Sequence, residues 1–239
     1  ALPIYFAGQD PDIKADTTLS TRAELDLQNQ SFAFDNLEIS SQVEGRDIPG
    51  QEAEFELKTD VLVQMQDQVC RLQNLALNTY GLEIKGKVKA SSFSSQPGFS
   101  GQLELSNFDP QDLFVRLGMD KPETRDPKVL SKAGAKMKFS GSSKDFQLES
   151  LEAVLDETNI QGQASVSRFN KPDIEFKLQA DALDADRYLP KTREESESVK
   201  SKEEKKDTEK GSRDKPLFPA LPLKTLRSMH LNGDLNVGK

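Results

Sequence analysis

The chain has 239 residues, an apolar content of 35% and a formal net charge of −8 at pH 7. Such an acidic chain lacks the basic surface that binds phosphate backbones, so the composition argues against a nucleic-acid-binding protein. The single cysteine, Cys70, excludes an intrachain disulfide and a zinc site built on thiolates. The low apolar content allows only a thin core, which favours a curved sheet or a narrow sandwich.

Apolar and polar residues alternate along most of the chain. The alternating segments include residues 23–27, 53–57, 82–90, 103–105, 135–139, 160–166 and 174–178. A period of two is typical of half-buried strands in an antiparallel sheet, with one apolar and one solvated face. We therefore predict a mainly β fold: an elongated, curved, largely antiparallel sheet of repeated units with one or two short helices.

Residues 110–117 predict the clearest helix. Asp109 is a suitable N-cap, Pro110 suits the first helical position and Gly118 suits the position after the helix end. Two turns of helix at this place can dock on the edge of a sheet.

Three other segments give weaker signals. A second turn starts at Asp184 and is stopped by Pro190, and residues 127–132 predict another short helical turn. Residues 61–71 begin with strand alternation and end with no clear period, so they stay ambiguous.

One sequence pattern occurs twice in the chain. Residues 72–91 align with residues 148–167 at an offset of 76, and residues 97–114 align with residues 172–189 at an offset of 75. A long fixed period in strand-like sequence indicates an array of similar units rather than one closed domain. Such arrays form elongated surfaces and grooves more often than compact catalytic pockets.

The composition also suggests boundaries. We expect an N-terminal β segment at 1–71, the two-copy β repeat at 72–190, a disordered charged loop at 191–216 and resuming β strands, truncated, at 217–239. The loop has too little apolar surface to offset the entropy of ordering. A solvated connection is the simpler interpretation of this loop, and a tether for a partner or a membrane surface is the alternative.

Gly86 and Gly162 occupy equivalent places in the two copies. Glycine weakens a strand unless it forms a bulge or bend, so we interpret both as points where the sheet curves; the alternative is that each is a neutral small residue. Nearby, Lys85, Lys87 and Lys89 form a basic row at strand spacing. A solvated strand face explains this row, with a phosphate or lipid-headgroup contact as the alternative.

The sequence offers little catalytic chemistry. His230 is the only histidine, and no nucleotide-binding, nucleophile-elbow or metalloprotease motif is present. The neighbouring carboxylates Asp156 and Glu157, like Asp184 and Asp186, fall at turns, where capping and solubility explain them. We predict that the chain is not an enzyme and has no cofactor, metal site or catalytic residue.

The order of several strings resembles a known family. FSGQLELSNFDPQDLFVRLG is followed by ETRDPKVLSK, then by KFSGS, LDETNIQGQASV and FKLQADALDADRYLP. This order is similar to the core of the AsmA family of bacterial envelope proteins, in which a charged insertion commonly follows and a strand pair like LRSMHLNGDLNVG resumes the fold. The resemblance covers roughly residues 70–239 well and the first 70 residues loosely.

The resemblance implies a function and a location. AsmA-like proteins are anchored in the inner membrane, and their periplasmic part is built from repeated β units similar to those of bridge-like lipid-transfer proteins. They are associated with outer-membrane biogenesis and phospholipid movement. This chain lacks the family's N-terminal membrane anchor, so we expect an excised periplasmic segment that contacts the membrane through an anchor missing from this chain.

The strand pattern and the family resemblance both lead to one candidate site. The predicted strands have more apolar face than the predicted helices can cover, so we expect an apolar β trough that holds phospholipid or other acyl chains. The candidate groove residues are Phe55, Leu57, Leu82, Ile84, Val88, Leu103, Leu105, Ile160, Val166, Ile174, Phe176 and Leu178.

Two alternatives to the trough stay open. The same side chains could pack against each other in a closed sandwich with no room for ligand. The chain could also be a structural or assembly module that contacts outer-membrane protein precursors or other envelope proteins through exposed strand edges, without lipid transport.

Overall fold

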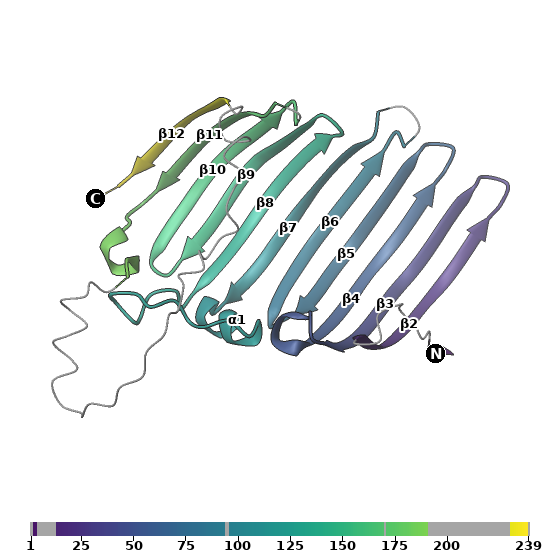
Figure 1. Cartoon of the computed structure of the whole chain (residues 1–239). Coiled ribbons are helices and arrows are strands. Elements are labelled where there is room, and N and C mark those ends of the chain that lie inside the picture. The colour runs from purple at the N-terminus through teal and green to yellow at the C-terminus, as the bar shows by residue number, and fades with distance from the viewer. Residues whose placement is uncertain (1, 4–12, 94–95, 170, 191–229, 239) are drawn as a thin grey trace.

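The protein folds into one large sheet. The computed structural model describes residues 2–3, 13–93, 96–169, 171–190 and 230–238. Twelve strands are hydrogen-bonded to one another in chain order, from β1 to β12. The result is an open, elongated and curved sheet (Figure 1). The predicted mainly β, largely antiparallel fold is confirmed.

The strands after the first contain 8 to 15 residues. They are β1 (Leu2–Pro3), β2 (Ile13–Asp26), β3 (Ser31–Gly45), β4 (Glu52–Gln64), β5 (Val69–Thr79), β6 (Leu82–Ser91), β7 (Gly98–Phe108), β8 (Ala133–Ser142), β9 (Asp145–Leu155), β10 (Thr158–Ser167), β11 (Asp173–Ala180) and β12 (His230–Val237). All neighbouring strands are antiparallel except β11 and β12, which are parallel. The predicted disordered loop, 191–216, lies outside the described residues.

The predicted helix is present as α1 (Pro110–Arg116). The Asp109 carboxylate accepts hydrogen bonds from the backbone N–H groups of Gln111 and Asp112, at 2.8 and 3.2 Å. These bonds satisfy N–H groups that the first helical turn leaves without partners. The cap predicted from the sequence therefore explains where α1 begins.

The weaker helix predictions had mixed outcomes. A short 3-10 helix, η2 (Ala185–Tyr188), follows Asp184, whose side chain makes no capping bond. Residues 127–132 form turns and bends and contain no helix, so that prediction was wrong. The reason lies in tertiary contacts, because the backbone N–H groups at 130–132 donate to the Asp156 carboxylate.

The first predicted boundary falls inside a strand. The ambiguous stretch 61–71 contains the end of β4, a turn and the start of β5. The β5 strand spans the expected boundary between 71 and 72, and the sheet continues through it without interruption. A further 3-10 helix, η1 (Pro49–Gln51), connects β3 to β4.

Bulges recur in alternate strands. Residues 35–36 of β3, 73–74 of β5, 106–107 of β7 and 149–150 of β9 each oppose a single residue of the next strand. Asp60 joins the first two bulges, because its carboxylate accepts from the Asn36 N–H and the Asn74 side-chain amide, at 2.9 and 2.6 Å. Bulges bend a strand and increase its twist, so this row contributes to the curvature of the sheet.

The bulges also locate the two repeated glycines. Gly86 and Gly162 each lie one residue from the position that opposes a bulge in the preceding strand. The bulges at 73–74 and 149–150 are 76 residues apart, as the sequence repeat requires. The repeat therefore describes a geometric unit, in which the irregular backbone belongs to β5 and β9 and the glycine lies beside it.

Candidate functional site

One face of the sheet is apolar from β2 to β12; we call it the apolar face. Residues directly opposite in neighbouring strands point to the same side of a sheet, so the strand register assigns each side chain to a face. One row of partners that crosses eleven strands without a polar residue is Leu19, Ile39, Leu57, Leu77, Ile84, Leu105, Ala135, Ala153, Ile160, Ala180 and Val237.

A second uninterrupted row runs parallel to the first. It consists of Phe34, Val61, Leu72, Val88, Gly101, Phe139, Leu148, Ala164, Phe176 and Gly233. Between the two rows lie Leu103, Met137, Leu151 and Leu178, which continue the apolar surface across the middle of the sheet. The apolar face is therefore continuous in the direction that crosses the strands.

All twelve candidate groove residues lie on the apolar face. The register places Phe55 and Leu57 of β4 on the same side as Ile174, Phe176 and Leu178 of β11, at the opposite part of the sheet. The side chains of all twelve are half-buried. Sequence alternation predicted this grouping because the period of two fixes the face within each strand.

No second layer of described strands or helices covers the apolar face. In the described part of the chain the buried apolar residues are Val69, Val129 and Ala180, and only Val129 is completely inaccessible. The helix α1 and the segment after it lie along one rim of the sheet (Figure 1). The closed sandwich considered from the sequence is not formed by the described residues.

Side chains on the apolar face lie over glycines of neighbouring strands. A Cβ atom added to Gly101 would lie 2.7 Å from the Phe139 ring, and one added to Gly162 would lie 2.5 Å from the Leu178 side chain. Phe99, Phe139 and Phe146 pack beside one another, with ring centroids 6.1 to 6.4 Å apart. The large side chains thus shield one another within a single layer, which explains why they are half-buried without a covering layer.

Replacing Gly162 with valine is expected to destabilise the sheet. The new side chain would meet Leu178 and the backbone oxygen of Lys177, both at 2.5 Å from its Cβ, so the strand pair must shift. We expect a loss of about 2 kcal/mol in the free energy of unfolding, measured by urea denaturation. The control Gln163→Val lies on the solvated face of the same strand and should change stability by less than about 0.5 kcal/mol; equal effects of both variants would contradict this prediction.

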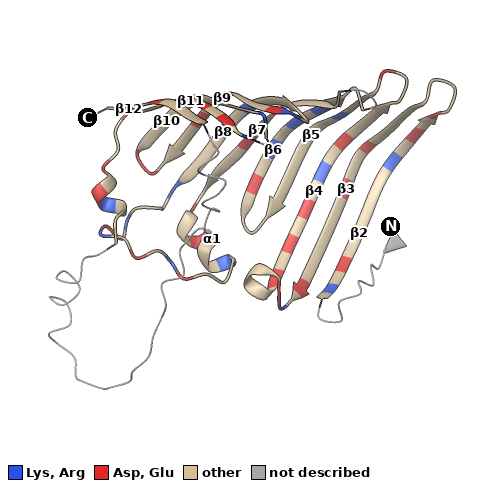
Figure 2. Ribbon diagram, turned by 45° about the horizontal axis from the view of Figure 1, so that its top comes forward, with Lys and Arg blue, Asp and Glu red and all other residues tan. Residues whose placement is uncertain are grey.

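The opposite side of the sheet is the polar face. Figure 2 shows that charged residues recur along the strands, and the register places many of them on this side. The row Lys85, Glu104, Lys136, Glu152 crosses β6 to β9, and the Lys136 ammonium lies 3.2 Å from the Glu104 carboxylate. The Lys85 ammonium lies 2.7 Å from Glu83. Bonds from Lys85 and from the Ser106 hydroxyl lower the pKa of Glu83.

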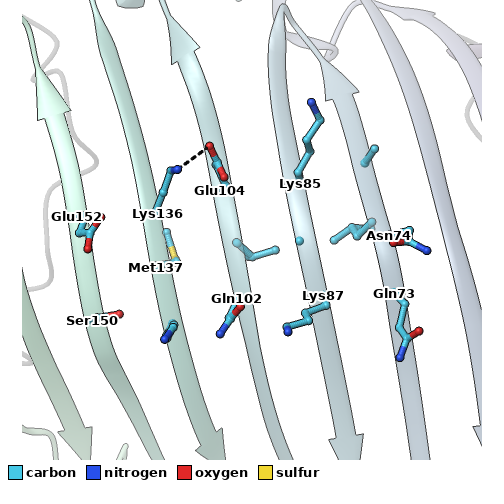
Figure 3. A pocket seen from close by; sticks show the side chains of 15 residues that line it. Gln73, Asn74, Lys85, Lys87, Gln102, Glu104, Lys136, Met137, Ser150 and Glu152 are labelled. Atoms are coloured by element: carbon cyan, nitrogen blue, oxygen red, sulfur yellow. Dashed lines mark ion pairs between the residues drawn. The ribbon is translucent and has the colours of Figure 1, made fainter.

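A shallow hollow of about 870 Å³ also belongs to the polar face. Its lining includes Lys85, Lys87, Gln102, Glu104, Lys136, Lys138, Ser150 and Glu152. Figure 3 shows side chains that line the hollow, with the Lys136–Glu104 ion pair marked by a dashed line. The three lysines of the predicted basic row, Lys85, Lys87 and Lys89, are all exposed on this face. The exposure of all three lysines, and the acidic partner of Lys85, agree with a solvated strand face at this row.

A cluster of hydrogen bonds, which we call the Asp156 cluster, forms at the rim near α1. The Asp156 carboxylate accepts from the backbone N–H groups of Leu130, Ser131 and Lys132, at 2.8 to 3.2 Å. It also accepts from the Ser131 hydroxyl at 3.1 Å and from the Tyr188 hydroxyl at 2.8 Å. One buried carboxylate thus holds the segment before β8 and the η2 turn together.

A second link of the Asp156 cluster is an arginine. Arg187 donates to Asp126 at 2.9 Å and to Glu157 at 3.1 Å. The backbone adds two bonds, from the Arg125 N–H to the Leu189 oxygen at 2.8 Å and from the Asp126 N–H to the Arg187 oxygen at 3.1 Å. The cluster therefore joins three segments that are far apart in the sequence.

These three segments coincide with strings on which the family resemblance rests. ETRDPKVLSK contains Asp126, LDETNIQGQASV contains Asp156, and FKLQADALDADRYLP contains Arg187 and Tyr188. The sequence assigned Asp156 and Glu157 to capping and solubility, and Asp156 does satisfy backbone N–H groups here. The sequence did not predict that these carboxylates contact Tyr188 and Arg187, because residues separated by up to 61 positions give no local signal.

The Asp156 cluster should make stability depend on pH at both extremes. Burial, with the bond to Asp156, raises the pKa of Tyr188 to about 12. Because an unfolded tyrosine titrates near pH 10, this contribution is complete below about pH 10 and is lost as the pH rises towards 12. Burial acts to raise the pKa of Asp156, but the bonds from Ser131, Tyr188 and the neighbouring N–H groups outweigh it and lower the pKa. That contribution is lost as the pH falls below about 4.

The variant Tyr188→Phe tests the expected loss of stability at high pH. Urea midpoints of wild type and variant should differ below pH 10 and converge towards pH 12, because the variant lacks the titrating hydroxyl. A difference that stays constant from pH 8 to 12 would contradict the assigned role of Tyr188.

Neither a metal site nor a membrane-spanning helix is found in the described part of the chain. No group of three or more His, Cys, Asp or Glu side chains there is placed to hold a metal ion. No helix among those residues is long and apolar enough to cross a membrane. Comparison of the chain with protein families, curated proteins and solved structures finds no match.

Proposed function

We propose that this chain is a periplasmic lipid-handling module of an AsmA-like protein, which holds or conducts phospholipid acyl chains along its apolar face. The observation that carries the proposal is the pair of uninterrupted apolar rows that cross the sheet from β3 to β12. The order of the AsmA-like strings supports the periplasmic setting and an inner-membrane anchor in the full-length protein.

The dimensions of the face suit acyl chains. Strands of ten or eleven residues, such as β6 and β7, span about 35 Å at about 3.3 Å per residue. An acyl chain occupies about half of the ~30 Å hydrocarbon core of a bilayer, or about 15 Å. The face therefore has room for whole acyl chains beside the strands, with headgroups able to reach the rims and water.

Energy and continuity both favour such an occupant. An exposed apolar surface of this extent is unfavourable in water, whereas each CH₂ group transferred onto it contributes about 0.8 kcal/mol. Because each row continues from strand to strand at about 4.8 Å steps, a chain can move along the face without crossing a polar residue. The acyl chain therefore does not have to leave one position completely before it contacts the next.

Lipid content and uptake test the proposal. The purified chain is extracted with organic solvent and analysed for phospholipid by mass spectrometry, and the delipidated chain is titrated with a fluorescent phospholipid. We expect co-purifying phospholipid and saturable uptake. Absence of both would reject lipid handling and favour the structural or assembly module, which needs neither.

A further inference from the structure

The rim opposite the Asp156 cluster, which we call the upper rim after its place in Figure 1, has a regular chemical pattern. It is formed by the turns that follow β2, β4, β6, β8 and β10. Four of these five turns carry one large apolar side chain that faces solvent: Leu27 is 76% exposed, Met65 49%, Phe93 40% and Phe169 47%. We call these four residues the apolar tips.

The tips recur with the sequence repeat. Phe93 and Phe169 are 76 residues apart, and Leu27 and Met65 are 38 apart, which is half of that period. The residues before the two phenylalanines, Ser92 and Arg168, have the same left-handed backbone conformation, with φ of 57° and 56°. Single exposed apolar residues are common on protein surfaces, but their recurrence at equivalent turns along one rim points to a contact outside the chain.

The turns are fixed relative to their neighbours. The Met65 N–H donates to the Gln30 oxygen at 3.0 Å, the Ser92 N–H to the Gln68 oxygen at 2.9 Å, and the Arg168 N–H to the Lys144 oxygen at 3.0 Å. Adjacent turns are two strands apart, or about 10 Å along the rim; because the turn after β8 carries no tip, Phe93 and Phe169 are about 20 Å apart. The upper rim therefore presents its apolar tips in a row.

The surroundings of the tips favour a lipid bilayer over a protein. A protein interface usually offers a contiguous apolar patch, whereas these tips stand singly. Their neighbours are uncharged polar residues such as Gln28, Gln66 and Ser92, together with the charged residues Asp26 and Arg168. The charged residues of the rim nearly balance: Lys144, Arg168 and Lys171 are basic, and Asp26, Asp67, Asp145 and Asp173 are acidic. Single apolar side chains amid polar groups whose charges nearly cancel suit insertion among headgroups.

We infer that the upper rim docks on the surface of a lipid bilayer by inserting the apolar tips Leu27, Met65, Phe93 and Phe169. This contact is separate from the binding of acyl chains on the apolar face and requires only a membrane surface. It would place a long side of the sheet, rather than one of its edge strands, against the bilayer. Because the rim charges nearly cancel, docking should depend little on ionic strength.

Tryptophan fluorescence tests the insertion directly, because the chain contains no tryptophan. In the full chain, Phe169→Trp should shift its emission to shorter wavelength when phosphatidylcholine vesicles are added, with the same result at high salt. The control Val115→Trp reports from exposed α1 at the other rim and should not shift. No shift at Phe169, or equal shifts at both positions, would overturn the inference.

A matched pair of quadruple variants tests the energetic role of the tips. Vesicle flotation should be weakened at least about tenfold when all four tips are changed to serine. The control changes four exposed apolar residues of the other rim, Val115, Met119, Leu183 and Leu189, to serine and should bind as wild type does. Because all eight positions are exposed, both variants should fold, as circular dichroism will show; unchanged binding by the tip variant would refute docking through this rim.

The two proposals can fail separately. A variant with a charge on the apolar face should still float with vesicles through its rim, and the tip variant should still take up fluorescent phospholipid from detergent. Loss of vesicle binding only in the face variant would assign membrane contact to the apolar face and refute the rim.

Discussion

Replacing Asp156 with alanine is expected to lower the free energy of unfolding by about 3 kcal/mol. The carboxylate accepts three backbone N–H groups and two hydroxyls, and it is buried beneath the segment that it holds. Alanine leaves these donors without their partner, and an unsatisfied buried donor costs about 1–3 kcal/mol. Because several donors are affected together, the loss should exceed that of any single hydrogen bond in the cluster.

Two controls separate the hydrogen bonds from other effects. Asp156→Asn keeps an acceptor oxygen and should have an intermediate effect. Glu157→Ala removes only the exposed carboxylate that Arg187 contacts, and because exposed ion pairs contribute little it should change stability by less than about 1 kcal/mol. Urea denaturation measures the global effect, and amide hydrogen exchange at Leu130 and Lys132 measures the local one. If Asp156→Ala is as mild as Glu157→Ala, the cluster does not secure this rim.

Replacing Leu103 with glutamate is expected to reduce phospholipid uptake at least about tenfold. Leu103 lies in the middle of the apolar face, opposite Gly86 in one direction and Met137 in the other. An acyl chain lying there would have to remove water from the new carboxylate, which is costly without a paired charge. The effect should appear in the affinity for fluorescent phospholipid, measured by titration of the delipidated chain.

The adjacent residue supplies the control. Gln102→Glu introduces the same charge one residue away, on the polar face, and should leave uptake unchanged. Circular dichroism should show the same strand content in both variants. Should Leu103→Glu reduce the strand content, the uncharged Leu103→Gln repeats the comparison. Equal uptake by the variants of residues 102 and 103 would contradict binding on the apolar face.

The sequence alone predicted the sheet and the division of its side chains into an apolar and a polar face. Alternation in residues 82–90 and 174–178 assigns each side chain to a face, and antiparallel pairing of neighbours brings these faces together. The helix at Pro110–Arg116 followed from its local cap. These features depend on residues close together in the chain, where spacing has a direct structural meaning.

Other features depend on partners that spacing does not show. The helical turn predicted at 127–132 is replaced by bonds to Asp156, and the link between Asp126 and Arg187 joins residues 61 positions apart. The sequence repeat drew attention to Gly86 and Gly162, so the bulges beside them in β5 and β9 were not predicted. The repeat of Phe93 and Phe169 is visible in the sequence. Their exposure, which distinguishes them from core residues, is known only from the structure.

Photo-crosslinking of lipid to the two faces tests the central claim most directly. The chain is loaded with a phospholipid that carries a photoreactive acyl chain, irradiated and digested, and the modified residues are identified by mass spectrometry. Within one strand, neighbouring residues such as Lys177 and Leu178 point to opposite faces, so the faces can be distinguished residue by residue. We predict modification at Val88, Leu103 and Leu178 and none at Lys87, Gln102 and Lys177. Modification mainly on the polar face, or none on either face, would contradict the proposed role of the apolar face.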